Sequence, residues 1–177
     1  MVIIITGASH TWKTYLAQMM LKKYGYPYLS IDHLKMGLIR SKNTSLSVED
    51  DDALTEYLWP IVSEIIKTNI ENEQNLIVEG CYVPFNFRDG FSEEYNKEIK
   101  FICLSMTKDY LLNHFLDIKS HANVIEKRLD DDCNLDVLIK DNEKYMMGFA
   151  LKNENVSLID SDFERVMDEL VNRFAMH

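Results

Sequence analysis

Residues 2–17 read "VIIITGASHTWKTYLA", and this segment indicates the fold class. It opens with an apolar run typical of a strand that is covered on both faces of a parallel sheet. A short turn follows, and an apolar stripe of helical period comes directly after it. The join nearly matches the phosphate-binding pattern G-x-x-x-x-G-K-[ST]. Gly7, Lys13 and Thr14 are in place, whereas Trp12 stands where the second glycine is expected.

A loop of this kind holds phosphate through backbone N–H groups that point inward, and glycine lets the chain curl without a clash at Cβ. The N-terminus of the following helix attracts the anion. The lysine adds charge beside the terminal phosphates, and the Ser/Thr hydroxyl coordinates magnesium, here Thr14. The pattern therefore favours a phosphate site over an ordinary strand-to-helix turn. The residues expected to contact the nucleotide are contiguous: Gly7, Ala8, Ser9, His10, Thr11, Trp12, Lys13, Thr14 and Tyr15.

Trp12 is the departure from the pattern. An indole cannot lie inside the curl of the loop, so it must point outward, towards solvent or a neighbouring strand end. If the backbone has a positive φ there, a tryptophan costs on the order of 1–2 kcal/mol of strain. Two outcomes follow: a formed loop that binds nucleotide weakly, or an open loop that binds no more than a small anion.

Further short runs rich in apolar residues alternate with helical patterns along the rest of the chain. Strands are expected at 2–6, 26–31, 75–80, 100–106 and 156–159. Helices are expected at 15–25, 32–40, from 47 through a kink or split at Pro60, 107–116, 137–150 and 161–174. This alternation predicts a three-layer α/β/α fold with a mostly parallel five-stranded sheet, formed by one domain over 1–177.

The composition of the chain excludes some classes of binding partner and indicates a cellular compartment. The chain has 177 residues and a net charge of -10, which argues against nucleic acid or an anionic membrane as a partner. Cys81, Cys103 and Cys133 are odd in number and lack a CxxC pair, as expected of reduced thiols in the cytoplasm. Neither a signal peptide nor an apolar stretch of membrane-spanning length is found. We expect a soluble cytoplasmic protein, monomeric or homodimeric.

Three segments together resemble a known family. "VIIITGASHTWKTYLA", "YLSIDHLKMGLIR" and "LIVEG" are similar, in this order and over residues 1–110, to the small P-loop kinases related to adenylate kinase. The resemblance implies a P-loop NTPase fold, ATP and Mg²⁺ as cofactors, and phosphoryl transfer to a small-molecule acceptor. It also implies a short helical region for the acceptor, about 32–73, and a lid, about 119–136.

In that family the second strand leads into a D-x-L-R segment whose arginine holds the phosphate of the acceptor. The matching residues here are Asp32 and Lys35, so a lysine replaces the arginine. Lysine is a point charge and not a two-pronged donor, so the acceptor should be recognised differently. Arg40, further along the same helix, is a second candidate for the acceptor. The alternatives are that Asp32 caps its helix and that Lys35 is a solvated surface residue.

The third strand of the family ends in an acidic residue followed by glycine, which Glu79 and Gly80 match. A carboxylate at this position can orient the water shell of magnesium or accept a proton from the acceptor. Its alternative role is structural. The next segment, "CYVPFNFRD", departs from the family in that Arg88 is displaced, and we keep Arg88 as a candidate for acceptor binding. Tyr82, Phe85 and Phe87 are candidates for the acceptor pocket or for ordinary packing.

The candidate lid is "KSHANVIEKRLDDD", and it carries few cations. Arg128 is the candidate for a contact to the transferring phosphoryl group, its alternative being a salt bridge with the neighbouring aspartates. Weaker candidates for a phosphate contact are Lys119, Lys127 and Lys140. Asp160 and Ser161, after the last strand, occupy the place where such kinases contact adenine through the backbone.

The leading hypothesis is an ATP-dependent phosphotransferase with Lys13, Asp32, Glu79 and Arg128 as its catalytic residues. The main alternative is a nucleotide-binding or vestigial P-loop protein without turnover, weakened by Trp12. A third hypothesis, a switch-type NTPase, lacks a recognisable switch or guanine-specificity motif.

Overall fold

The computed structural model describes residues 1–121 and 134–174. Its centre is one sheet of five parallel strands in the order β2-β3-β1-β4-β5. The strands are β1 (Val2–Gly7), β2 (Tyr28–Ser30), β3 (Leu76–Glu79), β4 (Ile99–Met106) and β5 (Val156–Ile159). All five lie where the sequence predicts them, and the sheet is parallel throughout. The strand that leads into the phosphate loop, β1, is in the middle of the sheet.

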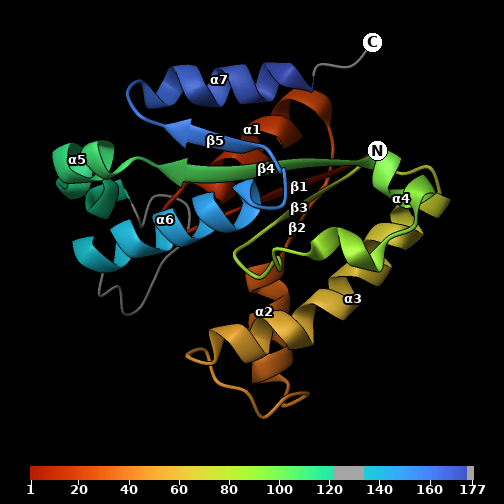
Figure 1. The fold of residues 1–177 in the computed structure, drawn as a ribbon. Coiled ribbons are helices and arrows are strands. Elements are labelled where there is room, and N and C mark those ends of the chain that lie inside the picture. The colour runs from red at the N-terminus through yellow and green to blue at the C-terminus, as the bar shows by residue number, and fades with distance from the viewer. Residues whose placement is uncertain (122–133, 175–177) are drawn as a thin grey trace.

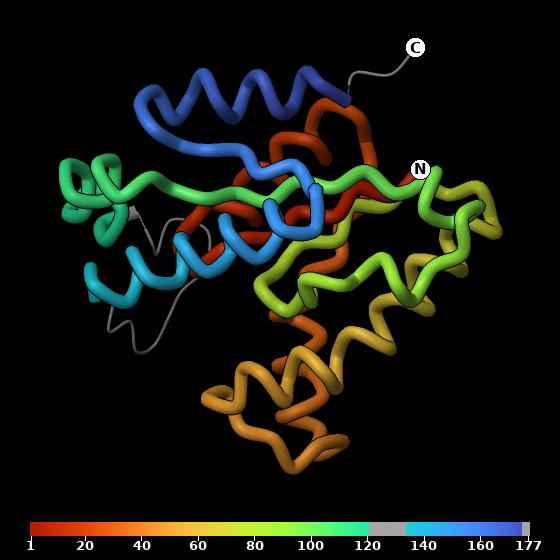
Figure 2. Tube along the Cα trace, viewed as in Figure 1, coloured from red at the N-terminus to blue at the C-terminus, as the bar shows by residue number. Residues whose placement is uncertain are grey.

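Helices cover both faces of the sheet, as Figure 1 shows. One face is covered by α1 (Lys13–Tyr24) and α7 (Phe163–Arg173), and the other by α3 (Asp51–Glu71) and α6 (Leu135–Ala150). The remaining helices are α2 (Ile31–Arg40), the short η1 (Phe87–Gly90), α4 (Glu93–Glu98) and α5 (Lys108–His121). The trace in Figure 2 shows α2 and the start of α3 projecting from the body of the domain. No helix in the described ranges is both long and apolar enough to cross a membrane.

The two faces of β1 explain its unbroken apolar run. Ile3 and Ile5 belong to the core on the side of α1 and α7, whereas Val2 and Ile4 belong to the core on the side of α3. All four side chains are fully buried. Successive side chains of a strand point to opposite faces, so both cores need apolar residues from this strand.

The long helix α3 differs from the sequence prediction. The sequence predicts a kink or a split at Pro60, and the helix is not split, because it runs from Asp51 to Glu71 with Pro60 inside it. Its face towards the core, which includes Leu58 and Val62, is fully buried, and this packing offsets the backbone hydrogen bond that proline cannot donate. The helix also begins later than expected, since the carboxylate of Asp50 accepts hydrogen bonds from the backbone N–H and the hydroxyl of Ser47.

Two further helices differ in detail. In α5 the helical spacing predicts one apolar face of Leu111, Leu112, Phe115 and Leu116. Leu112 and Leu116 are exposed, however, while Ile118 is buried. In α7 the residue that caps the N-terminus is Asp162, whose carboxylate accepts from the backbone N–H of Arg165. The sequence pattern of Ser161 followed by Glu164 predicts a capping box with Ser161 as the cap, and this prediction is wrong.

Candidate functional site

Several residues that the sequence predicts for a nucleotide and acceptor site lie at the carboxyl edge of the sheet. Because the strands are parallel, their carboxyl ends meet at one edge, where ligands of such folds bind. The phosphate loop follows β1, and Asp32 lies in the first turn of α2, directly after β2. Glu79 is the last residue of β3, and Asp160 follows β5.

The predicted phosphate loop, residues 7–15, is closed around its own lysine. Gly7 has φ 144°, and a Cβ added to it would lie 2.1 Å from the carbonyl oxygen of Leu104, so no other residue fits there. The side chain of Lys13 is buried, and its Nζ donates a hydrogen bond to the carbonyl oxygen of Ala8 at 2.7 Å. The hydroxyl of Thr11 donates to the same oxygen at 2.8 Å. An ammonium group thus lies in the curl, at the N-terminus of α1.

Trp12 has the conformation that its glycine counterpart would favour. Its φ of 56° and ψ of 34° place it in the left-handed region, immediately before α1. The indole packs against the ring of Phe163, the first residue of α7, with 4.2 Å between ring centroids. Tyr15 contacts the same ring, at 5.8 Å. The loop therefore keeps a curled shape with the indole turned towards α7.

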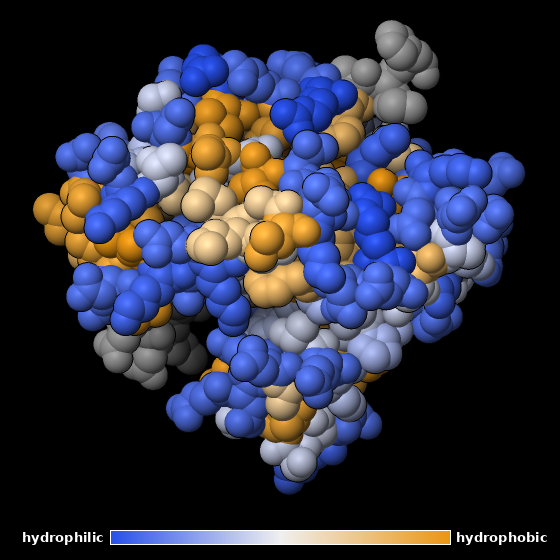
Figure 3. Space-filling view, in the orientation of Figure 1, coloured by the Kyte–Doolittle hydropathy of each residue, from blue (hydrophilic) through white to orange (hydrophobic). Residues whose placement is uncertain are grey.

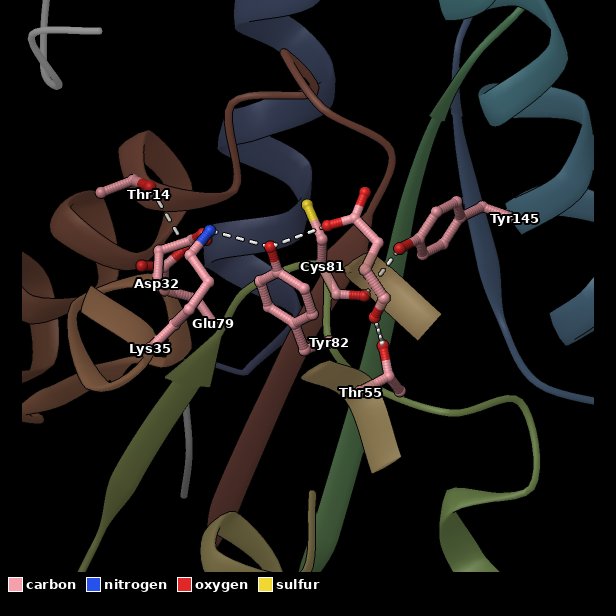
Figure 4. Close-up of polar contacts among 9 residues, drawn as sticks. Thr14, Asp32, Lys35, Thr55, Glu79, Cys81, Tyr82 and Tyr145 are labelled. Atoms are coloured by element: carbon pink, nitrogen blue, oxygen red, sulfur yellow. Dashed lines mark hydrogen bonds and ion pairs between the residues drawn. The ribbon is translucent and has the colours of Figure 1, made fainter. Parts of the chain in front are cut away.

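Thr14 and Glu79 form the first half of the site. The hydroxyl of Thr14 donates to Oε2 of Glu79 at 3.1 Å, and the Glu79 side chain is almost fully buried (Figure 4). Hydroxyl and carboxylate oxygens suit Mg²⁺, which usually takes one or two protein ligands together with water and phosphate oxygens. No group of three or more His, Cys, Asp or Glu among the described residues could hold a metal unaided. The pair therefore fits a magnesium ion that accompanies a nucleotide.

A chain of hydrogen bonds forms the second half of the site, and we call it the polar chain: Asp32, Lys35, Tyr82 and Asp51. Nζ of Lys35 donates to Oδ1 of Asp32 at 2.9 Å and to the phenol oxygen of Tyr82 at 2.8 Å. Tyr82 in turn donates to Oδ1 of Asp51 at 3.0 Å. Figure 4 shows Lys35 and Asp32 on one side of Tyr82. The polar chain joins the first turns of α2 and α3 to the segment after β3.

Burial controls the protonation of the neutral groups here. Burial, with the charges of Asp32 and Asp51 adding to it, raises the pKa of the Tyr82 phenol, so this group keeps its proton. Burial likewise raises the pKa of the Cys81 thiol, and the charge of Lys13 opposes the shift. The Cys81 carbonyl accepts a hydrogen bond from the phenol of Tyr145 at 2.6 Å. The site is therefore lined by hydroxyl and thiol groups that remain protonated.

Two of the arginines predicted for the acceptor are not brought to this edge. Arg88 forms an ion pair with Glu154 and donates from Nη1 to Asn96 at 3.2 Å. Glu154 and Asn96 lie just before β5 and β4, at the opposite, amino edge of the sheet. Arg40 is the exposed last residue of α2, about 12 Å along the helix axis from Asp32.

Of the aromatic candidates and the lid candidates, too, the structure places only some at the site. Tyr82 belongs to the site, but Phe87 is buried in the core and stacks on Phe101. Phe85 packs edge-on against Phe149. Lys127 and Arg128, the centre of the candidate lid, lie outside the described residues. The other candidates are exposed on the surface: Lys119 on α5, Lys140 on α6, and Asp160 and Ser161 after β5.

Three residues of the site were not identified from the sequence: Asp51, Cys81 and Tyr145. Asp51 lies in the acidic run at the start of α3, where carboxylates are common in the first turn of a helix. Tyr145 comes from α6, and nothing in its local sequence indicates that it approaches β3. The one available signal was the position of Cys81, directly after the Glu79–Gly80 pair.

Comparison of the sequence finds no matching family profile and no matching curated protein. Solved structures do match over nearly the whole chain. A shikimate kinase from Bacteroides thetaiotaomicron has 16% identity and a TM-score of 0.58, covering 99% of this chain and 98% of that one. A sugar kinase from a Janibacter species has 15% identity and a TM-score of 0.56, covering 97% and 92%. A gluconokinase from Sinorhizobium meliloti has 14% identity and a TM-score of 0.52, covering 98% and 93%.

At these identities the likeness shows the fold alone. The chain has the α/β fold of P-loop kinases, with a five-stranded parallel sheet between layers of helices. The fold class predicted from the sequence is confirmed.

Proposed function

We propose that the chain is an ATP-dependent phosphotransferase that acts on a hydroxyl group of a small acceptor. The observation that carries this proposal is the phosphate loop, with the Lys13 ammonium inside its curl and Thr14 bonded to Glu79 beside it. Similar solved structures that are kinases support it at the level of the fold.

The residues divide into a nucleotide half and an acceptor half. The loop N–H groups and Lys13 would hold the phosphates of ATP, and Thr14 with Glu79 would hold Mg²⁺. Bound Mg–ATP supplies the terminal phosphoryl group, which passes to an acceptor hydroxyl oxygen while ADP leaves and the hydroxyl proton goes to a carboxylate. Asp32 is our candidate for that carboxylate, since Lys35 holds it in one orientation at the edge of the sheet. Arg128 and Lys127 remain predictions for contacts to the transferring group.

Catalysis in such a site depends on positioning and on fixed charges. Lys13 is held by a carbonyl and Asp32 by an ammonium, so neither has to reorganise far when charge moves between the substrates. The buried phenols add donors that stay protonated at neutral pH.

A second candidate function is nucleotide binding without turnover. The left-handed Trp12 favours it, because it places a Cβ where the family's loop carries glycine, close to the expected phosphates. Production of ADP that depends on an acceptor separates the two candidates.

The proposal is tested first by Mg–ATP binding to Lys13→Met, measured by calorimetry. Methionine keeps the buried stem of the side chain and removes its charge. We expect the Kd for Mg–ATP to rise by about tenfold or more, equivalent to about 1.4 kcal/mol. Lys22→Met, at an exposed lysine of the same helix, is the matched control and should bind like the parent. Equal affinity in the two variants would sink the phosphate-loop assignment.

A further inference from the structure

The charge of Lys35 is already compensated within the protein. Its ammonium bonds to Asp32 and Tyr82, and Tyr82 bonds onward to Asp51, so the polar chain places one cation between two carboxylates. Only 12% of the Lys35 side chain is exposed. A negatively charged acceptor group would have to compete with Asp32 for this ammonium.

The surroundings of the polar chain add further negative charge. Asp141 of α6 is half-buried, and its pKa is raised, mainly by burial and in part by the charge of Asp51. Lys144 opposes that shift, and it also lies 4.0 Å from Asp52, the neighbour of Asp51. The carboxylates between α3 and α6 therefore lie close enough to repel one another.

Cations suited to binding an anion lie elsewhere in the described parts of the chain. A carboxylate or phosphate on an acceptor is best held by the two-pronged donor of arginine. Arg88 is bound to Glu154 at the amino edge of the sheet, and Arg40 is at the far end of α2.

A buried hydroxyl beside the site supplies an independent observation. Ser30 pairs in register with Glu79, so their side chains point to the same face of the sheet, where Thr14 also lies. Ser30 is 3% exposed, and its Oγ has no hydrogen-bond partner among the described residues. Buried hydroxyls are nearly always bonded. This hydroxyl thus lies beside Glu79 with its hydrogen-bonding capacity unused.

We propose that the acceptor is a hydroxylated small molecule without negative charge, either uncharged or amine-bearing; this inference rests on the proposed function. The carboxylates of the polar chain can accept hydrogen bonds from hydroxyl and ammonium groups, and they repel an anion. Figure 3 shows a hollow between the lobe formed by α2 and α3 and the body of the domain. The acceptor would enter from that side.

The test uses matched sets of acceptors that differ in charge: glucose, glucosamine and glucuronate, then ethylene glycol, ethanolamine and glycolate. Binding to the full chain is measured by thermal shift and calorimetry in the presence of Mg–ATP, and ADP release is followed in parallel. The uncharged or amine-bearing member of a set should bind about tenfold or more tightly than the anion, equivalent to about 1.4 kcal/mol. Shikimate and gluconate serve as further anions.

Failure of the inference and failure of the proposed function give different results. If Mg–ATP alone neither raises the melting temperature nor gives heat of binding, the proposed function fails. If Mg–ATP binds but an anion matches or exceeds its uncharged partner, the acceptor inference alone fails. A panel in which no uncharged or amine-bearing compound responds counts equally against the inference.

A pair of variants tests the polar chain directly. Asp51→Asn removes one carboxylate and keeps the shape of the side chain. We expect it to weaken binding of the amine-bearing acceptor by about fivefold, equivalent to about 1 kcal/mol. Asp52→Asn is the matched control, because Asp52 lies in the same first turn of α3 with its side chain fully exposed. The same loss of affinity in both variants would show that general charge, not the polar chain, selects the acceptor.

Discussion

Trp12 combines a backbone conformation that tryptophan disfavours with a ring contact that compensates for it. A left-handed φ costs on the order of 1–2 kcal/mol for a residue with a Cβ, and packing of the indole on Phe163 offsets this. The strain is a cost to the stability of the fold. The expected weaker affinity for nucleotide would come from the Trp12 Cβ, close to the expected phosphates.

The difference in stability between Trp12→Gly and Trp12→Ala measures the backbone strain at position 12 separately from the ring contact. Both variants lose the ring contact, but glycine alone adopts the left-handed conformation without strain. We expect Trp12→Gly to be more stable than Trp12→Ala by about 1 kcal/mol in chemical denaturation. At an ordinary helix position the order is reversed, so an alanine variant as stable as the glycine variant would refute the strain.

We predict that Asp141 makes the stability of the fold depend on pH. Its pKa is raised in the folded state, so the folded protein holds this proton more tightly than the unfolded chain does. The ionised carboxylate therefore destabilises the fold at neutral pH, and Asp141→Asn should raise the melting temperature at pH 7. The gain should shrink as the pH falls towards the ordinary carboxyl value of 3.8, where both states become protonated. Glu143→Gln, at an exposed neighbour, is the control.

The packing of α6 against the segment after β3 depends on a glycine. A Cβ added to Gly148 would lie 2.4 Å from the ring of Phe85, which itself packs between Tyr145 and Phe149. This contact holds α6, and with it Tyr145, against the Cys81 end of the site.

Gly148→Ala should therefore destabilise the protein by about 1–3 kcal/mol, because the aromatic ring must move. Gly37 of α2 offers a matched position, since nothing lies within 4 Å of a Cβ added there. Gly37→Ala should stabilise the fold by about 0.5–1 kcal/mol. Thermal unfolding of both variants checks the pair, and a stabilised Gly148→Ala would contradict the close approach.

The elements were predictable where local pattern decides them. All five strands were found, since each is a short apolar run, and the loop after β1 has the expected curled shape because its residues are contiguous. The helix is not split at Pro60 because packing against the core outweighs the local propensity of proline. Leu112 and Leu116 misled because helical spacing identifies a face but not whether another element covers it.

At the level of the whole molecule, Arg88 is a structural tie between distant segments. It joins η1 to Glu154 in the connection between α6 and β5, and to Asn96 before β4. The Glu154 carboxylate is 9% exposed, so this carboxylate depends on its partner.

Arg88→Met should destabilise the protein by about 2–3 kcal/mol, since it leaves a nearly buried carboxylate without its arginine. The double variant Arg88→Met/Glu154→Gln should recover part of that loss in urea denaturation. Binding of Mg–ATP and acceptor by the folded Arg88→Met protein should match the parent. A loss of acceptor binding without a loss of Mg–ATP binding would show that Arg88 belongs to the acceptor site.

The sequence did not predict which residues lie at the carboxyl edge of the sheet and which lie at the amino edge. Glu79 ends β3, and Thr14 begins the helix after the β1 loop, so the order of the strands brings them together. Asp51 begins α3 and Arg88 lies in the short η1, and tertiary packing sets where each of them lies. No local pattern distinguishes the edge of the sheet at which each side chain ends. The arginine expected at the acceptor is therefore at the opposite edge, while an aspartate that resembled a helix cap belongs to the polar chain.

The central place of β1 also sets the order of events during synthesis. Its neighbours in the sheet begin at Leu76 and Ile99, so the ribosome makes β1 long before either partner exists. At typical rates of translation the strand waits roughly 5 to 20 seconds for β4. Through that interval one of the most apolar runs of the chain has no sheet to join, which makes it a natural point of contact for chaperones. The loop that would bind phosphate therefore gains its neighbouring strands only after more than half of the 177 residues have been synthesised.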